Sequence, residues 1–257
     1  MFVVVNIPLI PLRAEADERS EMVSQLLFGQ QVEILESSDK WFYIKNLSDG
    51  QVGWIGKRTV DSHFFTNNAI DTSKFNAAKT PMLTCFKTSK VEKIVLPGGS
   101  MLPPLTREQF ELSGEIYQIA QIEPVYTKKN NGQLVLELAQ QYTNTPYLWG
   151  GKSFMGIDCS GLVQVIYSML GIFLPRNASQ QVEMGHVVDF LSESQPGDLA
   201  FFANENNDII HVGILINPHQ IIHASGFVKK EIIDSQGIIS SQTGEYSHNL
   251  RVIKRVI

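Results

Sequence analysis

The sequence predicts an α+β protein in which one or two small β-barrels precede a domain of helices and an antiparallel sheet. Short strand-like runs separated by turn residues fill the first sixty residues. Two stretches with helical spacing follow residue 130, and three apolar, strand-like runs come after them. Many short strands at even spacing are typical of barrels, and helices followed by strands indicate an α+β arrangement.

The first barrel is expected over residues 1–60. Its predicted strands are separated by turns rich in Gly, Ser and Asp, the residues that punctuate short strands. The strands are expected at residues 3–8, 22–27, 31–36, 41–46 and 52–55.

Residues 61–125 are expected to form a linker arm and a divergent second barrel. A polar stretch at 62–78 predicts the connection, and the strand rhythm then returns more weakly. The second set of strands is expected at residues 81–86, 90–96, 101–104 and 115–122.

The last domain is expected over residues 126–257. Asn130 or Asn131 is a suitable N-cap for a helix over 132–143. Apolar spacing predicts a second helix over 157–171. Strands are expected at 197–203, 211–216 and 221–224, with a hairpin turn at 217–219 between the last two.

Composition excludes several functions. The 257 residues carry a net charge of -5 with scattered Lys and Arg, so neither a nucleic-acid surface nor a polybasic membrane patch is expected. The opening residues lack the basic leader of a secretory signal, which favours a cytoplasmic protein. Cys85 and Cys159 make no metal-type spacing, and Cys85 is expected to be a small buried apolar residue.

Cys159 is the candidate nucleophile. It follows a glycine-rich loop and opens a predicted helix, where backbone N–H groups and the helix dipole are expected to lower the pKa of a thiol. The alternative is a structural cysteine in a core. The neighbours Gly156, Asp158, Ser160 and Gly161 are small or polar, which disfavours that alternative.

Two histidines are candidates for the base that a thiol needs. His211 and His223 lie on consecutive predicted strands, and a register that pairs His211 or Gly213 with His223 brings the imidazoles together on one face. His223 would then orient His211. The alternative is two core histidines. The remaining histidines, His63, His186, His219 and His248, are expected to be solvated.

Four segments in order, DCSG, GDLAFF, HVGI and IIHAS, resemble the NlpC-type family of cell-wall cysteine peptidases over residues 130–257. That resemblance implies a papain-like fold with a helix-borne cysteine on an antiparallel sheet. The run LRAEADERSEMVSQLLFGQQVEILE, followed by WFYIKN and GQVGWI, resembles a bacterial SH3-like domain over residues 1–60. The combination resembles the γ-D-glutamyl-L-diamino acid endopeptidases of the dipeptidyl-peptidase VI kind.

By this resemblance, Cys159, His211 and His223 form a catalytic triad that needs no metal or cofactor. Tyr147 falls at a family tyrosine beside the oxyanion site; the alternative is a packed aromatic residue before a turn. The implied substrate is a murein peptide with a free N-terminal L-Ala, cleaved during cell-wall peptide recycling. Trp149, together with Trp41 and Trp54, is expected to be a core anchor.

The resemblance also suggests an amine-binding pocket. Asp158 matches the motif position that meets the substrate ammonium, with Ser160 beside it, and Glu21 is a candidate for a second anionic contact. The alternatives are a helix N-cap for Asp158 and a solvated surface acid for Glu21. The family often has an aromatic residue shortly before the Gly-Trp pair of the barrel, where this chain has Gln51.

Arg176 and Ser179 are candidates to meet the α-carboxylate of D-Glu, although capping of the following helix is slightly favoured. Two other functions stay open at this point. One is a cell-wall binding protein with an inactive peptidase-like domain, and an intact Cys-His-His set argues against it. The other is a thiol amidase or acyltransferase, which the same fold permits.

Overall fold

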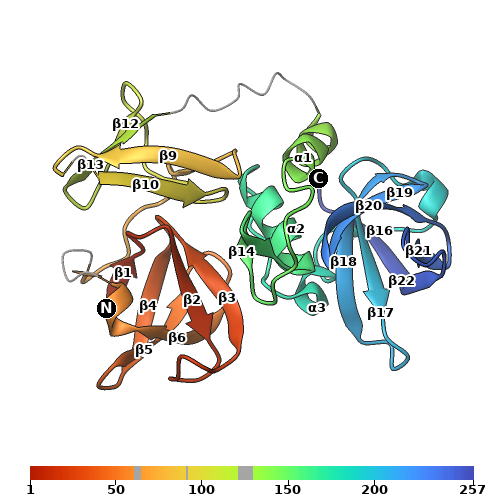
Figure 1. The fold of residues 1–257 in the computed structure, drawn as a ribbon, viewed down its shortest axis with the longest axis horizontal. Helices are drawn as coiled ribbons and strands as arrows, with labels where there is room; N and C mark the ends of the chain where they lie inside the picture. Colours follow the sequence, from red (N-terminus) through yellow and green to blue (C-terminus); the bar gives the residue numbers. More distant parts are fainter. Residues whose placement is uncertain (61–64, 91, 121–129) are drawn as a thin grey trace. The chain divides into compact units, whose positions relative to one another are not determined.

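The computed structural model describes residues 1–60, 65–90, 92–120 and 130–257 and divides into two compact units (Figure 1). The first unit is Met1–Pro124 with Trp149–Phe154, and the second is Val125–Leu148 with Met155–Ile257. The three-domain division at residues 60 and 125 stays a prediction. His63, part of the expected linker arm and the end of the strand expected at 115–122 lie outside the described residues.

The first sheet of the first unit has seven antiparallel strands in the order β3-β2-β6-β5-β4-β1-β7. The strands are β1 (Phe2–Val4), β2 (Leu9–Arg13), β3 (Met22–Leu27), β4 (Gln31–Ser37), β5 (Trp41–Asn46), β6 (Val52–Gly56) and β7 (Phe65–Thr66), with a 3-10 turn at Lys57–Thr59. The single strand expected at 3–8 is wrong. Strand β1 stops at Val4 and a separate strand begins at Leu9, because Pro8 has no N–H to donate to a ladder.

The rest of the first unit is a second antiparallel layer with its own core. Its strands are β8 (Asn76–Ala77), β9 (Met82–Lys87), β10 (Glu92–Pro97), β11 (Met101–Leu102), β12 (Gln109–Leu112) and β13 (Glu115–Ile119). Four of them form a sheet in the order β10-β9-β13-β12, and β11 pairs with β8. Cys85 is fully buried in this core, which confirms its prediction as a small buried residue.

Phe28 connects the two layers of the first unit. Its ring contacts Phe110 and Tyr117 edge-on, with centroids 5.9 and 5.3 Å away, and its carbonyl accepts a hydrogen bond from the Met101 N–H. The chain then turns at Gly29, whose φ is +77° and whose Cα faces the Met101 carbonyl. A side chain at Gly29 would occupy the space of that carbonyl.

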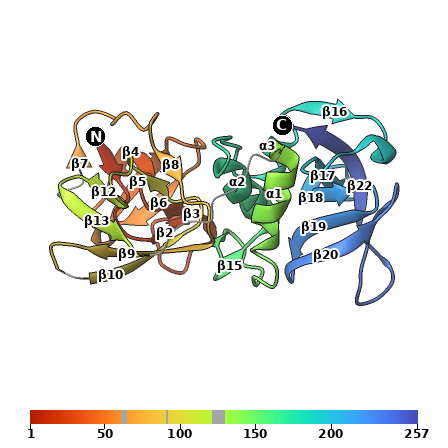
Figure 2. The same ribbon diagram turned by 90° about the horizontal axis from the view of Figure 1, so that it is seen from above.

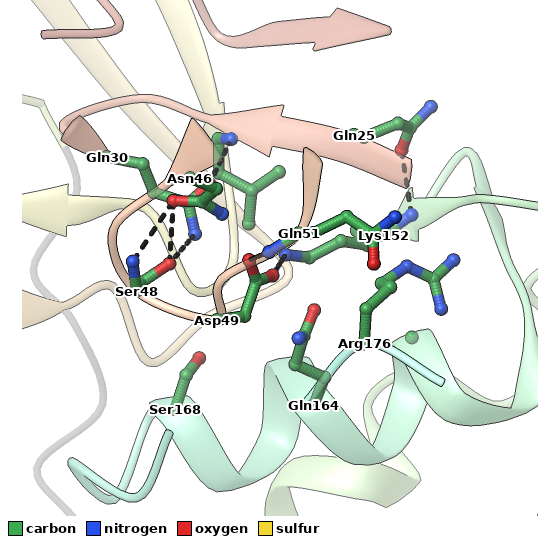
Figure 3. A network of polar contacts seen from close by, with 12 residues as sticks. Gln25, Gln30, Asn46, Ser48, Asp49, Gln51, Lys152, Gln164, Ser168 and Arg176 are labelled. Carbon is green, nitrogen blue, oxygen red and sulfur yellow. Dashed lines mark hydrogen bonds and ion pairs between the residues drawn. The ribbon is translucent and has the colours of Figure 1, made fainter. Parts of the chain in front are cut away.

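The segment Trp149–Phe154, which contains β14 (Lys152–Ser153), packs with the first unit. The Lys152 backbone N–H donates to Gln25 Oε1 at 2.7 Å, and the Lys152 ammonium lies 3.9 Å from Asp49 Oδ2 (Figure 3). Both side chains of the ion pair are only 3% exposed. The Asp49 turn is itself shaped by Asn46, which accepts hydrogen bonds from Ser48.

The second unit combines three helices with a closed barrel (Figures 1 and 2). The helices are α1 (Asn131–Gln140), α2 (Cys159–Ser168) and α3 (Ala178–Gln181), and the strands are β15 (Gly156–Ile157), β16 (His186–Val188), β17 (Leu199–Ala203), β18 (Ile209–Asn217), β19 (Gln220–Ser225), β20 (Phe227–Ile233), β21 (Gly237–Ile239) and β22 (Tyr246–Arg255), with a 3-10 turn at Leu191–Glu193. The sheet order is β16-β22-β17-β18-β19-β20-β21, and β21 also pairs with β22, so six strands form a ring. Asn130 caps α1, as predicted.

The barrel interior has an apolar core and a polar end. Leu215, Ile221 and Ile233 pack in the core with apolar residues of the other strands. Helix α2 packs on β18 and β19 and against α1 (Figure 2). Side chains two residues apart share a strand face, so the inward face continues from Leu215 to His211 and from Ile221 to His223. In the described residues, no helix has the length and apolar character needed to cross a membrane.

Two glycine substitutions test the contact between the layers of the first unit. Gly29→Ala places Cβ 1.8 Å from the Met101 carbonyl oxygen, whereas Gly50→Ala has a similar φ of +73° and open space around it. Urea unfolding should show a loss of about 1–2 kcal/mol for Gly50→Ala, from the left-handed backbone alone. Gly29→Ala should lose about 1–3 kcal/mol more through overpacking. Equal losses would contradict the close contact.

Candidate active site

Cys159 is the first residue of α2 and is 7% exposed. Asp158 caps the helix, because its Oδ1 accepts a hydrogen bond from the Gly161 N–H at 2.7 Å. The Ser160 N–H, from the first turn of the helix, and the Val212 N–H, from β18, both donate towards the sulfur. The Asp-Cys-Ser-Gly sequence thus begins a helix and places the thiol beside the strand that carries His211.

Burial raises the pKa of the Cys159 thiol to about 11, and the nearby Asp158 charge adds to the shift. The two N–H groups and the Arg176 charge act in the opposite direction but are outweighed. The N–H groups act in the predicted direction, but the expected net lowering of this pKa is wrong. The free-energy cost of removing a thiolate from water exceeds the stabilisation that the first turn of one helix gives the thiolate.

His211 and His223 form a hydrogen-bonded pair in the polar end of the barrel. His211 Nε2 lies 2.8 Å from His223 Nδ1, and the two side chains are 5% and 0% exposed. Ile214 of β18 pairs with Ile222 of β19, which puts Gly213 opposite His223 and confirms the predicted register. A Cβ at Gly213 would approach His223 Cβ to 2.9 Å, so the absence of a side chain there leaves room for the ring.

Glu231 extends this hydrogen-bonded pair, and no sequence motif predicted its role. Its Oε2 lies 2.8 Å from His223 Nε2. Its Oε1 accepts hydrogen bonds from the Ser241 N–H and Oγ at 2.8 Å and lies 3.1 Å from the Lys229 ammonium. Burial alone raises the pKa of Glu231, but the hydrogen bonds from His223, Ser241 and Lys229 outweigh burial and hold the pKa far below its usual range.

His248 of β22 stacks on His211, so the expectation that it is solvated is wrong. The ring centroids are 4.1 Å apart and the planes differ by 28°. Burial, with the charge of His223, lowers the pKa of His248 to about 4. Burial, with His248 and His223, also lowers the pKa of His211 well below 6.5. Both rings are consequently neutral at pH 7. Of the other histidines, His186 and His219 are exposed, as expected.

The three imidazoles each offer a nitrogen within 4.8 Å of the others. Both nitrogens of His223 already lie at hydrogen-bond distance from His211 and Glu231. The rings of His211 and His248 are nearly parallel, so their in-plane lone pairs do not converge on one point. His211 and His223 thus form a hydrogen-bonded network with Glu231, and His248 stacks on it.

Tyr147 belongs to the surroundings of the thiol. Its N–H donates to the Gly226 carbonyl at 2.9 Å, and it bridges to Ile157, two residues before Cys159. Burial raises the pKa of the Tyr147 hydroxyl to about 12, and the charges of Cys159 and Asp158 contribute to the shift. The hydroxyl is therefore protonated, able to donate a hydrogen bond, and within electrostatic reach of Cys159.

Arg176 is bound to the residues at the start of α2. Its Nη1 lies 3.0 Å from Asp158 Oδ1 and 2.8 Å from Ser160 Oγ, and the side chain is 2% exposed. The slightly favoured capping role of Arg176 and Ser179 is wrong. Asn177 is the N-cap of α3, and its N–H is met by Gln180 Oε1, while Ser179 is exposed on the helix.

Glu21 has a partner in the first unit. Its Oε1 accepts a hydrogen bond from Trp149 Nε1 at 2.6 Å. Trp149 is 61% exposed, so the expectation of a core anchor is wrong for this residue. Gln51 is half-buried in the same unit, and its N–H donates to Asp49 Oδ1 at 3.0 Å.

Comparison with known proteins identifies two domains. The NlpC/P60 family matches residues 144–253, and the bacterial dipeptidyl-peptidase SH3 domain matches residues 12–58. The chain therefore carries an NlpC/P60 domain, a cell-wall peptidase domain, behind an SH3-like domain of the bacterial dipeptidyl-peptidase type.

The chain is similar along most of its length to two named peptidases. The γ-D-glutamyl-L-lysine dipeptidyl-peptidase of Bacillus subtilis (strain 168) is 27% identical over 216 residues, which cover 78% of this chain and 71% of that protein. The dipeptidyl-peptidase 6 of Lysinibacillus sphaericus is 29% identical over 236 residues, covering 83% and 84%. A crystal structure of an NlpC/P60 family protein from Bacillus cereus ATCC 10987 matches 100% of this chain and 99% of its own with a TM-score of 0.82 at 18% identity, which supports the fold.

The raised thiol pKa can be measured by alkylation. Because the pKa of Cys159 is about 11, its reaction with iodoacetamide should rise with pH through the range 8–11, as the thiolate forms. The rate is followed by mass spectrometry of the intact protein. Cys159→Ala gives the background from Cys85. A rate that is high and constant from pH 5 to 8 would contradict this account, because it would indicate a preformed thiolate–imidazolium pair.

Proposed function

We propose that the protein is a cysteine endopeptidase that hydrolyses the γ-D-glutamyl–L-diamino acid bond of murein peptides carrying a free N-terminal L-Ala. The observation that carries the proposal is the hydrogen bond between His211 and His223 beside the thiol. His211 lies next to Val212, whose N–H donates towards the Cys159 sulfur. The similarity to the γ-D-glutamyl-L-lysine dipeptidyl-peptidase of Bacillus subtilis (strain 168) supports the choice of bond. A role in recycling cell-wall peptides belongs to the same proposal, and the expected cytoplasmic location stays a prediction.

The first half of the reaction is acylation of the thiol. Cys159 Sγ attacks the γ-glutamyl carbonyl carbon while its proton passes to His211, which is neutral at pH 7. The resulting oxyanion accepts hydrogen bonds from the Cys159 N–H and the Tyr147 hydroxyl; one such donor is typically worth about 10²–10³ in rate. His211 then gives the proton to the departing amine of the diamino acid, and a thioester remains on Cys159.

The second half returns the enzyme to its starting state. His211 takes a proton from water as the water attacks the thioester carbonyl. Collapse of the second tetrahedral intermediate breaks the carbon–sulfur bond, and the proton returns to Cys159. The products are L-Ala-D-Glu and the peptide that begins with the diamino acid. A neutral thiol–imidazole pair requires that proton transfer and attack proceed together.

Recognition of the free amine is the finer part of the proposal. Asp158 and Ser160 lie at the start of α2 beside the thiol, where an acidic group can meet the ammonium of L-Ala. Arg176 holds both residues in place, so its contribution to the pocket is to fix the Asp158 carboxylate. A second anionic contact from Glu21 stays a prediction; within the first unit its carboxylate accepts a hydrogen bond from Trp149. Direct contacts of Arg176 and Ser179 with the D-Glu α-carboxylate stay predictions.

A product assay tests the function. Wild-type protein should release L-Ala-D-Glu from L-Ala-γ-D-Glu-diaminopimelate or from its lysine counterpart, as detected by mass spectrometry. The N-acetylated peptides should react at least tenfold more slowly, because they lack the ammonium. Cys159→Ala should abolish release, while Cys85→Ala, a matched change at the other buried cysteine, should retain it.

The outcomes separate the alternatives. Equal cleavage of the free and acetylated peptides would leave the nucleophile in place and overturn the amine pocket. Transfer of the acyl group to an added amine, without hydrolysis, would indicate an acyltransferase. No reaction with any of the peptides would contradict the proposed function and favour the binding protein.

A further inference from the structure

The hydrogen bonds around Glu231 determine where protons lie in the active site. Glu231 is 4% exposed, and its side-chain carboxyl is nearly inaccessible at 1%. Its Oε1 faces only donors, namely the Ser241 N–H, the Ser241 hydroxyl and the Lys229 ammonium. These donors hold the group ionised, and an ionised carboxylate only accepts hydrogen bonds. His223 Nε2, at 2.8 Å from Oε2, must therefore carry a proton.

The next two rings follow from this constraint. A neutral imidazole has one N–H and one lone pair, so when His223 is neutral, its proton on Nε2 leaves a lone pair at Nδ1. His211 Nε2 lies 2.8 Å from that lone pair and must donate to it. With its proton on Nε2, neutral His211 has its free lone pair on Nδ1. A base must have such a lone pair.

We propose that Glu231 is a positioning residue that fixes the tautomers of His223 and His211 and so assigns Nδ1 of His211 as the basic nitrogen. Three other charged or titratable groups surround the chain of rings. Lys229 pairs with Glu231 on the same strand, His248 stacks on His211 from β22, and Cys159 lies at the start of α2. None of the three donates to His223, so the carboxylate alone sets its tautomer.

Replacement by glutamine is expected to reverse the proton arrangement. The amide of Glu231→Gln has one oxygen and one NH₂ group, and the donors from Ser241 and Lys229 attract the oxygen. The NH₂ group then faces His223 Nε2 and donates to it. His223 carries its proton on Nδ1 and donates to His211 Nε2, so the proton of neutral His211 lies on Nδ1 and the base is lost.

The test is a series of substitutions at Glu231, with peptide cleavage and iodoacetamide alkylation of Cys159 at pH 8 as readouts. Glu231→Gln should lower kcat about 10²–10⁴-fold, the range for loss of a general base, with little change in KM, and should slow alkylation at least tenfold. Glu231→Ala imposes neither tautomer and should be more active than Glu231→Gln. Glu231→Asp keeps the acceptor-only group and should be the most active variant.

The order of activities distinguishes positioning from support of the fold. If Glu231 only filled space or held Lys229, the isosteric glutamine would be better tolerated than alanine. That result would overturn the proposal. Glu183→Gln, at an exposed acid of the same unit, is the control and should match wild type. Should Glu231→Gln fail to fold, the comparison is between the other two variants. A Glu231→Ala variant that is at least as active as Glu231→Asp would overturn the proposal.

The inference rests on the proposed function, and the two fail in different ways. Absence of cleavage by wild-type protein would reject the proposed peptide substrate. The alkylation series still reports on the base, because it needs no substrate. Equal alkylation rates in wild type and Glu231→Gln would reject the role of Glu231 even when wild-type protein cleaves the peptide.

Discussion

The active site depends on one buried hydrogen-bonded chain that runs from Glu231 through His223 to His211. A buried carboxylate is costly unless it is hydrogen-bonded and paired. Lys229 lies two residues from Glu231 on the same strand, and Ser241 follows strand β21, which pairs with β20. Each ring is then held by a partner on the neighbouring strand. The barrel therefore gives His211 a fixed orientation, which separate loops cannot provide without further support.

Local patterns in the sequence were enough to predict most strands of the first unit, and the two longer helices and strands β17, β18 and β19 of the second. The helix at α1 and its Asn130 cap followed from apolar spacing and a capping residue, and the β18–β19 hairpin followed from two apolar runs around Asn217 and Pro218. The closed barrel could not be predicted in the same way. Strand β20 largely alternates exposed and buried residues, and most of β22 is exposed or half-buried. Ring closure through β21 depends on pairings between distant segments.

In the active site as well, residues in local motifs were predicted, and residues brought in by pairing of distant segments were not. Cys159, His211 and His223 were found because each lies in a short motif and the two histidines lie on consecutive strands. Glu231 was missed because KKEII resembles an ordinary solvated strand, although the alternation that points Ile233 inward also points Glu231 inward. His248 was missed because stacking across β22 leaves no local signal. The thiol pKa was predicted in the wrong direction, because burial of Cys159 cannot be read from its helix position.

The most direct test of the hydrogen-bonded chain is nitrogen NMR of the histidine rings in uniformly ¹⁵N-labelled protein at pH 7, with assignments from His248→Gln and His223→Gln. The account predicts that neutral His211 carries its proton on Nε2 and leaves Nδ1 unprotonated, and that His223 carries a proton on Nε2. A His211 ring with its proton on Nδ1 would contradict the account, because the lone pair would then face His223 instead of being available to the thiol.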